Sequence, residues 1–295
     1  MKAVRTIEEL RSGIRALQIN LGPEATVGLV PTMGYLHEGH ASLIRRARED
    51  NGIVVVSIFV NPIQFGPGED YETYPRDEAR DLALAEAEGA DLVFLPSVET
   101  MYPQPTKTKI MVSDITTRLC GASRPGHFDG VTTVVSKLFN IVQPDKGYFG
   151  MKDVQQVAVL QQMVQDLNMS VEIVPCPIVR EEDGLALSSR NVYLSEEERR
   201  QALVLSRSLR EAAAAVSEGT AVTAGDIRNL LQRVISQSPL ADIEYAEVVS
   251  FPGLQPYPDD EEISRKDEAV LMALAVRFGR TRLIDNRLIN PKEAN

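Results

Sequence analysis

The sequence predicts an α/β protein: a doubly wound, Rossmann-like parallel sheet followed by a second, smaller α+β domain. The segment Ile53–Val60 reads IVVVSIFV, and such an unbroken β-branched run is typical of a parallel strand covered on both faces. Similar short runs alternate with helical segments as far as residue 180, which is the order of βαβ units. Beyond that point two helical segments precede three strand-like runs. We therefore expect a first domain over residues 1–180 and a second over residues 181–295.

The elements of the first domain follow from the spacing of apolar residues, which recur every three or four positions in helices and are continuous in buried strands. Thr6 is the expected N-cap of the first helix. In chain order the expected elements are helix Ile7–Leu17, strand Val27–Pro31, helix Ala41–Asp50, strand Ile53–Val60, helix Asp77–Glu88, strand Ala90–Pro96, helix Val131–Val142, strand Lys146–Phe149, helix Val154–Leu167 and strand Val171–Val179. Ligands of a doubly wound sheet bind outside the carboxyl ends of its strands, so the loops there are the expected site.

The second domain is expected to follow the polar break Glu181–Gly184, which reads EEDG and is a candidate hinge. Its expected elements are two helices and three mostly antiparallel strands, namely Glu196–Glu218, Ala224–Gln237, Ile243–Val249, Ala269–Phe278 and Thr281–Ile289. A small α+β unit that follows a hinge suggests a lid.

Composition and charge argue against several classes of protein. The 295 residues are 43% hydrophobic and 25% charged, no apolar run is long enough to cross a bilayer, and the N-terminus has no signal-peptide core. Cys120 and Cys176 lie in no disulfide or metal-ligand spacing. The net charge of −11 argues against nucleic acid as a partner but does not exclude small anionic substrates. We expect a cytoplasmic protein without membrane or nucleic-acid partners, whose positive groups gather at one place.

The first segment that carries chemistry, Pro31–His40, leaves a predicted strand and enters a helix with the sequence PTMGYLHEGH. A helix N-terminus offers N–H groups and the positive end of its dipole to phosphate, and glycines let the backbone approach a ligand closely. His37 and His40 can donate hydrogen bonds to phosphate oxygens, and they are positively charged when protonated. Two alternatives stay open. The histidines lie in an ordinary surface loop, or they bind zinc, for which only Glu38 offers a third ligand nearby.

Two further strand ends carry polar side chains. After one strand, in the sequence NPIQFG, Asn61 and Gln64 can fix a hydroxyl or carboxylate, and the alternative is an Asn-Pro turn with Gln64 in solvent. At the start of the helix after another strand, Lys152 would supply a point charge to phosphate. Asp153 is the expected N-cap there, and Gln156 can face the same pocket. The alternative for this segment is a capped helix with a solvated lysine.

A fourth polar cluster follows the candidate hinge, and it reads LALSSRN over Leu185–Asn191. Two hydroxyls and an arginine suit phosphate, although a serine-rich linker is the alternative. The third histidine, His127, lies in the sequence RPGHFDG just before a helix. All three histidines thus occupy glycine-containing turns before helices, and the loops of a doubly wound sheet converge on one crevice. We therefore expect a shared anion pocket.

Six motifs taken together resemble one family. PTMGYLHEGH, FVNPIQFG, YPR, RPGHFDGV, FGMKDVQQ and LALSSRN are similar, in order and spacing, to the motifs of the pantothenate synthetases, which are nucleotidyltransferases with a HIGH-type motif. The resemblance runs from Pro31 to Asn191 and continues weakly to Ile284–Asn286. It implies that ATP activates pantoate as pantoyl-adenylate, that β-alanine then attacks the acyl carbon, and that AMP and pyrophosphate are released. Mg²⁺ would accompany ATP, and the resemblance also suggests a homodimer.

The resemblance also implies roles for individual residues. His40 would be the proton donor, and His37, Lys152 and Arg190 would complete the catalytic set. Gln64 would hold pantoate and β-alanine, Gln156 would hold pantoate, and Asp81 is a candidate on the Mg²⁺ side. The ATP contacts would be Met33, Gly34, Tyr35, Leu36, His37, Glu38, Gly39, His40, Gly150, Met151, Lys152, Asp153, Val179, Leu187, Ser188, Ser189 and Arg190.

Two departures from the family pattern are visible, and two other functions stay open. Leu187 stands where many members carry methionine, and Met151 stands where a polar residue is common, which puts fine contacts in doubt. One alternative is a nucleotidyltransferase of the same superfamily that acts on another small substrate. The other is a nucleotide-binding or assembly protein without catalysis, although such a protein has no need for convergent histidine, lysine and arginine groups.

Overall fold

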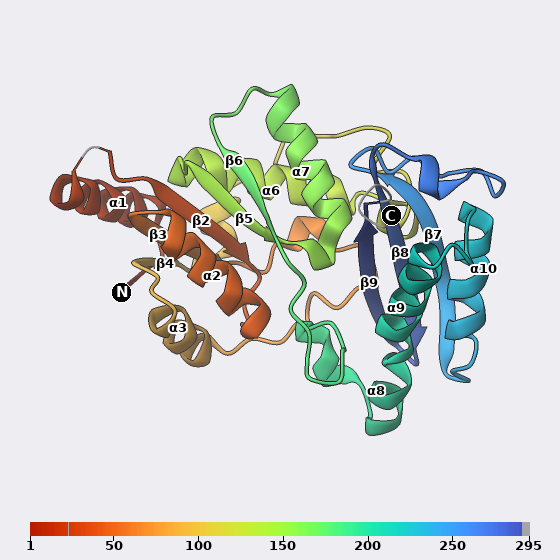
Figure 1. The fold of residues 1–295 in the computed structure, drawn as a ribbon. Helices are drawn as coiled ribbons and strands as arrows, with labels where there is room; N and C mark the ends of the chain where they lie inside the picture. The colour runs from red at the N-terminus through yellow and green to blue at the C-terminus, as the bar shows by residue number, and fades with distance from the viewer. Residues whose placement is uncertain (23, 291–295) are drawn as a thin grey trace. The chain divides into compact units, whose positions relative to one another are not determined.

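The computed structural model describes residues 1–22 and 24–290, which form two compact units (Figure 1). The first unit comprises residues 1–113 and 124–178, and the second comprises residues 114–123 and the chain from Val179 onward. The sequence pattern places a boundary after residue 180. The structure divides the chain two residues earlier and adds the segment 114–123 to the second unit.

A six-stranded parallel sheet, in the order β1-β4-β3-β2-β5-β6, organises the first unit. Its strands are β1 (Lys2–Val4), β2 (Val27–Thr32), β3 (Ile53–Ile58), β4 (Leu92–Phe94), β5 (Lys146–Gly150) and β6 (Glu172–Cys176). From β2 the chain proceeds to β3 and β4 on one side, and it later continues through β5 and β6 on the other. The order of the strands therefore reverses between β2 and β5, where doubly wound sheets bind their ligands.

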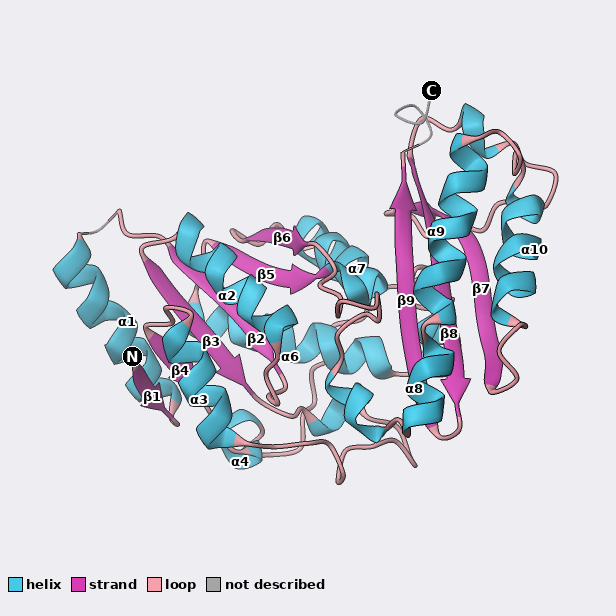
Figure 2. Cartoon of the chain, turned by 60° about the horizontal axis from the view of Figure 1, so that its bottom comes forward, coloured by secondary structure: helices cyan, strands magenta, loops and turns pink. Residues whose placement is uncertain are grey.

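Helices cover both faces of this sheet (Figure 2). Those of the first unit are α1 (Ile7–Leu21), α2 (Glu38–Asp50), α3 (Glu78–Ala87), α4 (Val98–Met101), α6 (His127–Val142) and α7 (Val154–Asp166). Helix α6 contacts both α1 and α7, whereas α2 and α3 form a second contacting pair. The side chains of Ile53 to Val56 in β3 are fully buried between these layers, as the unbroken apolar run predicted.

The second unit contains a three-stranded antiparallel sheet in the order β7-β8-β9, with two helices packed on it. Its elements are β7 (Ala241–Phe251), β8 (Ala269–Phe278), β9 (Thr281–Ile289), α8 (Glu196–Ala202), α9 (Val204–Ser217) and α10 (Ala224–Ile235). The short helix α5 (Cys120–Ser123) joins this unit, because the Cys120 thiol lies 3.2 Å from the Tyr245 hydroxyl of β7.

The predicted fold class is confirmed, and the differences concern single elements. The helix expected over Glu196–Glu218 is two helices that meet at Leu203. Strand β1 was not predicted, because three residues with one buried side chain give no periodic signal. Helix α6 begins four residues before its predicted start, after a left-handed Gly126 whose missing side chain gives no capping signal. Within the described residues no helix is long and apolar enough to span a membrane.

Candidate active site

The loop that follows β2 is held by one buried carboxylate from α3. Asp81 accepts hydrogen bonds from the backbone N–H of Tyr35, at 2.8 Å, and of Leu36, at 2.6 Å. Gly34 and Tyr35 both have positive φ, and a Cβ on Gly34 would lie 3.0 Å from the Asp81 carboxylate. Burial raises the pKa of Asp81, and the two N–H donors oppose that shift. The turn into α2 therefore depends on the Asp81 clamp and on the missing side chain of Gly34.

This geometry does not suit Asp81 as a ligand of Mg²⁺, the role for which the sequence made it a candidate. Both carboxylate oxygens already accept main-chain N–H groups inside the unit, and only 1% of the residue is exposed. A group of three or more His, Cys, Asp or Glu side chains that could hold a metal ion is also absent from residues 1–22 and 24–290. We assign Asp81 to the support of the loop and derive no metal-dependent step from it.

His37 and His40 lie together at the N-terminus of α2, with ring centroids 4.1 Å apart. The Nδ1 atom of His37 accepts the Gly39 N–H at 3.1 Å, and Nδ1 of His40 accepts the His37 N–H at 3.3 Å. Burial, followed by the nearby Lys152 and Arg80 charges, lowers the pKa of His37 to about 4. Burial also holds the pKa of His40 well below its usual range, with His37 and Lys152 as further causes. Both imidazoles are therefore neutral at pH 7 and carry their proton on Nε2 as a hydrogen-bond donor.

The loop after β5 brings Lys152 toward these histidines. Strands β2 and β5 are paired neighbours, so their carboxyl ends emerge side by side. Lys152 is half-buried in the turn Met151–Asp153, and its charge helps to lower the pKa of both His37 and His40. Asp153 occupies the N-cap position of α7, as predicted, but its side chain makes no capping hydrogen bond. Gln156 is half-buried in the first turn of α7.

Gln64 is buried beside the β2 loop and does not extend into solvent. It ends the short helical turn η1 (Pro62–Gln64) and is 9% exposed. Its Oε1 accepts a hydrogen bond from Asn61 at 3.0 Å, and its Nε2 lies 3.2 Å from the Met33 sulfur. The Asn61 amide accepts the Tyr102 hydroxyl at 2.8 Å. This amide pair thus lies in direct contact with the loop that carries the histidines.

A chain of three side chains supports the main chain of Gln64. Glu69 accepts two hydrogen bonds of 2.7 Å from Arg124, whose guanidinium lies 3.0 Å from Nε2 of His127. Arginine can only donate, so His127 accepts at Nε2 and donates from Nδ1 to the Gln64 carbonyl at 2.9 Å. Burial, followed by the Arg124 charge, lowers the pKa of His127 to about 4. His127 therefore holds the main chain of Gln64 in place, and both of its ring nitrogens already have protein partners.

The serine and arginine cluster lies in the second unit. The Leu187 N–H donates to the Val179 carbonyl at 3.0 Å, which closes the base of a hairpin. The Ser188 hydroxyl accepts the Arg190 N–H at 3.2 Å and caps the helical turn η3 (Ser189–Tyr193). This segment is thus an ordered part of the second unit and not a plain linker.

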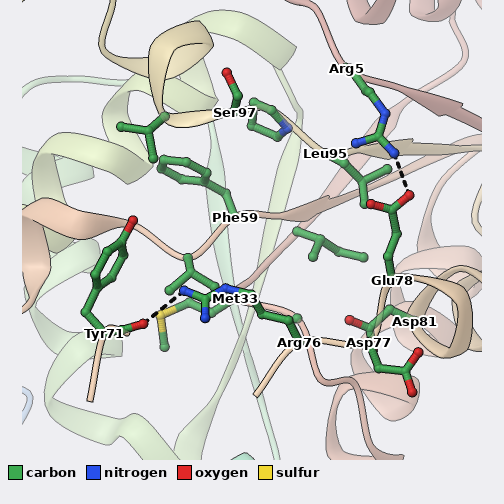
Figure 3. A pocket seen from close by; sticks show the side chains of 15 residues that line it. Arg5, Met33, Phe59, Tyr71, Arg76, Asp77, Glu78, Asp81, Leu95 and Ser97 are labelled. Atoms are coloured by element: carbon green, nitrogen blue, oxygen red, sulfur yellow. Dashed lines mark hydrogen bonds and ion pairs between the residues drawn. The ribbon is translucent and has the colours of Figure 1, made fainter. Parts of the chain in front are cut away.

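A cavity of about 270 Å³ opens at the carboxyl ends of β1 to β4 (Figure 3). Met33, Gly34 and Asp81 line it from the loop already described. Its two arginines have partners: Arg5 pairs with Glu78 at 2.5 Å, and Arg76 donates to main-chain carbonyls, among them that of Tyr71 at 2.9 Å. This cavity is lined by the start of the loop that carries the histidines, and we assign no substrate to it.

The close packing of α6 against η1 predicts that one added methyl group at Gly130 will lower the stability of the protein. A Cβ on Gly130, in α6, would lie 2.5 Å from the Cα of Gln64 and 2.5 Å from the Ile63 carbonyl oxygen. Gly130→Ala must therefore push α6 away from η1, and we expect the free energy of unfolding to fall by about 1–3 kcal/mol. Urea unfolding measures this loss. The control is Gly66→Ala, whose nearest contact would be 3.9 Å, and equal stability of the two variants would contradict the close approach.

The buried imidazoles predict how stability depends on pH. His37 and His127 have pKa values of about 4 in the folded chain against 6.5 when unperturbed, so the unfolded chain binds more protons between these values. Their contribution to the free energy of unfolding is therefore present above pH 6.5 and is lost as the pH falls toward 4. Urea unfolding across this window tests the slope. The slope should be shallower in His127→Gln, and an unchanged slope would contradict the burial of that ring.

The fold and the site define a class: a doubly wound α/β protein whose donor groups meet at the carboxyl edge of its sheet, as in many nucleotide-binding enzymes. Comparison with known proteins narrows this class. The family model described as pantoate-beta-alanine ligase matches residues 2–288, and the chain belongs to that family.

Similar proteins share the whole length of the chain. A pantothenate synthetase of Acetivibrio thermocellus is 56% identical over 98% of this chain and 99% of its own, and one of Caldicellulosiruptor bescii is 53% identical over 99% and 100%. The solved structure of pantothenate synthetase from Thermus thermophilus superposes with a TM-score of 0.87 at 45% identity, covering 99% of both chains. The Francisella tularensis ligase, solved with β-γ ATP and β-alanine, superposes with a TM-score of 0.77 at 33% identity and covers 99% of both chains.

Proposed function

We propose that this protein condenses pantoate with β-alanine, using ATP and releasing AMP and pyrophosphate through a pantoyl-adenylate. The observation that carries the proposal is the pair of neutral imidazole donors at the N-terminus of α2, with Lys152 from the β5 loop beside them. Membership of the pantoate–β-alanine ligase family supports the identity of the substrates.

In the first step an oxygen of the pantoate carboxylate attacks the α-phosphorus of ATP, and the bond from that phosphorus to the bridging oxygen breaks. Negative charge builds on the phosphate oxygens and on departing pyrophosphate. We assign hydrogen-bond donation to the Nε2–H groups of His37 and His40, and charge neutralisation to Lys152 and the α2 dipole. The family motif makes His40 the proposed proton donor; we propose that its neutral ring acts by donating a hydrogen bond from Nε2–H, because transfer of that proton would leave an imidazolate.

In the second step the neutral amine of β-alanine attacks the acyl carbon, AMP leaves with the electron pair of the broken carbon–oxygen bond, and the nitrogen gives up one proton to solvent. We propose that Gln64 contacts both pantoate and β-alanine and that Gln156 contacts pantoate. Neutral amides suit this task because they can bind hydroxyl and carboxylate groups without adding a charge that must be desolvated.

We propose that ATP contacts come from three segments. The first is the β2 loop with the start of α2, from Met33 to His40, and the second is Gly150 to Asp153 after β5. The third belongs to the second unit, where Ser188, Ser189 and Arg190 would contact phosphates and Val179 and Leu187 would lie near the nucleotide. Mg²⁺ would accompany ATP and would help to neutralise the charge of its phosphates, and we assign no protein ligand to it. A cytoplasmic homodimer is the expected form of the enzyme.

Exchange of labelled pyrophosphate into ATP tests the proposed function. The purified protein should catalyse exchange only when pantoate is present, and it should form AMP and pantothenate when β-alanine is added. Exchange that ignores pantoate but responds to another small substrate would favour the alternative of a different nucleotidyltransferase. Absence of any turnover would favour a binding protein and overturn the proposal.

A further inference from the structure

The serine and arginine segment of the second unit continues from one arm of a small hairpin. Arg180 and Ala186 form an antiparallel bridge, and the Glu181 N–H donates to the Leu185 carbonyl at 2.8 Å. The turn between them closes through Gly184, whose φ of +98° favours glycine. Ser188 directly follows Leu187, whose N–H makes the last hydrogen bond of this paired arm, so the position of the hairpin influences the position of the segment Leu187–Arg190.

One ion pair ties the base of this hairpin to β9. The Arg180 guanidinium donates two hydrogen bonds to the Asp285 carboxylate, of 2.7 and 2.8 Å, and a third to the Gly184 carbonyl at 3.1 Å. The Asp285 side chain is 2% exposed, and its Oδ1 also accepts the Asn286 N–H at 2.8 Å. A two-pronged pair of this kind fixes orientation as well as distance.

The hairpin and the segment have other contacts as well: Leu185 is buried in the hydrophobic core of the second unit, and the turn η3 contacts β9. Arg199 pairs with Glu181 and Asp183 at the exposed turn, at 2.5 Å each, but α8, which carries Arg199, does not lie in the sheet. Asn191 donates to the Ala186 carbonyl at 3.1 Å, which links the segment to its own hairpin. Among the polar contacts named here, the pair with Asp285 is the one that joins the hairpin to a strand of the sheet.

We propose that Arg180 and Asp285 are a positioning pair that holds the segment Leu187–Arg190 fixed to β9. This inference rests on the proposed function, in which Ser188, Ser189 and Arg190 contact the phosphates of ATP. The pair sets the orientation of the hairpin base from which this segment continues. Without it the hairpin keeps its apolar packing but loses the two parallel hydrogen bonds to β9, so its groups would be less well placed to bind the phosphates.

The test replaces the pair by apolar side chains, Arg180→Met with Asp285→Leu. The Arg180 side chain is partly exposed and that of Asp285 is buried, and replacing both partners of such a pair leaves no unpaired buried charge, so stability should be largely retained. A second variant, Arg180→Lys, keeps the charge for Asp285 but cannot form the two parallel hydrogen bonds. The matched control is Arg199→Gln, which removes the pairs at the exposed turn. Thermal unfolding confirms that each variant is folded.

Two measurements then decide the proposal. Hydrogen exchange of the amides in residues 179–191 should be about tenfold faster in the pair variants than in wild type and control. The KM for ATP should rise by about tenfold, with the KM for β-alanine within about twofold of wild type. Unchanged hydrogen exchange, or faster exchange with an unchanged KM for ATP, would overturn the positioning role. If the wild type lacks pantoate-dependent pyrophosphate exchange, the proposed function fails, whereas hydrogen exchange still reports whether the pair holds the segment.

Discussion

Lys152→Ala is expected to lower the rate of pantoate-dependent pyrophosphate exchange by about 10² or more. The lysine supplies the positive charge that the β5 loop adds beside the imidazole pair, since its ammonium is a cause of the low pKa of both His37 and His40. Neutral histidines can donate hydrogen bonds to phosphate but cannot neutralise it. Removal of the one ammonium should therefore affect adenylation more than the binding of β-alanine, which carries no phosphate.

The same strand provides a matched control for this variant. Lys146 begins β5, at the opposite end of the strand, and its ammonium lies 3.8 Å from the Asp50 carboxylate. A partly exposed pair of this kind contributes little, so Lys146→Ala should keep exchange within about twofold of wild type. Equal losses in Lys146→Ala and Lys152→Ala would show that the effect comes from the strand or from net charge, and it would contradict a phosphate role for Lys152.

The sequence predicted the parts of the candidate site that lie next to helices and strands with a clear hydrophobic pattern. The unbroken run in β3 and the histidines before α2 are local signals, and parallel pairing then places the loops after β2 and β5 side by side. The expected crevice follows from that topology. The protonation state of the histidines could not be predicted in this way, because the low pKa of His37 arises mainly from burial, and burial of a loop residue cannot be read from the sequence.

The supports behind the site could not be predicted from the sequence. Asp81 is 45 residues from Leu36, and an acidic residue in the first turn of a helix is ordinarily explained by the helix dipole. The partner of Arg124, Glu69, lies 55 residues away in an irregular segment without periodicity. Gly130 gave no signal either, because the expected helix began at Val131 and left this glycine in the turn before it, whereas the observed helix begins at His127. The role of segment 114–123 in the second unit likewise depends on contacts that are distant in sequence.

Different replacements of His40 distinguish the roles of its two ring nitrogens. His40→Ala removes both the Nδ1 acceptor of the His37 N–H and the Nε2–H donor, and we expect exchange to fall by about 10² or more. In His40→Asn the side-chain oxygen can take the place of Nδ1, so the loop should be retained while the donor is lost. In His40→Gln the terminal amide reaches about as far as Nε2 and can donate there, although the acceptor near the backbone is lost.

If donation from Nε2 carries the effect, His40→Gln should recover about tenfold of the rate that His40→Ala loses, and His40→Asn should recover little. The pH profile provides an independent check. A neutral hydrogen-bond donor does not need to gain a second proton. The wild-type rate should therefore not rise as the pH falls below neutral, and its pH profile should match that of His40→Gln. Recovery by asparagine but not by glutamine would show that His40 acts by holding the loop through Nδ1. A rate that rises as the imidazole gains a second proton would show that the charged ring, and not the buried neutral one, is the active form.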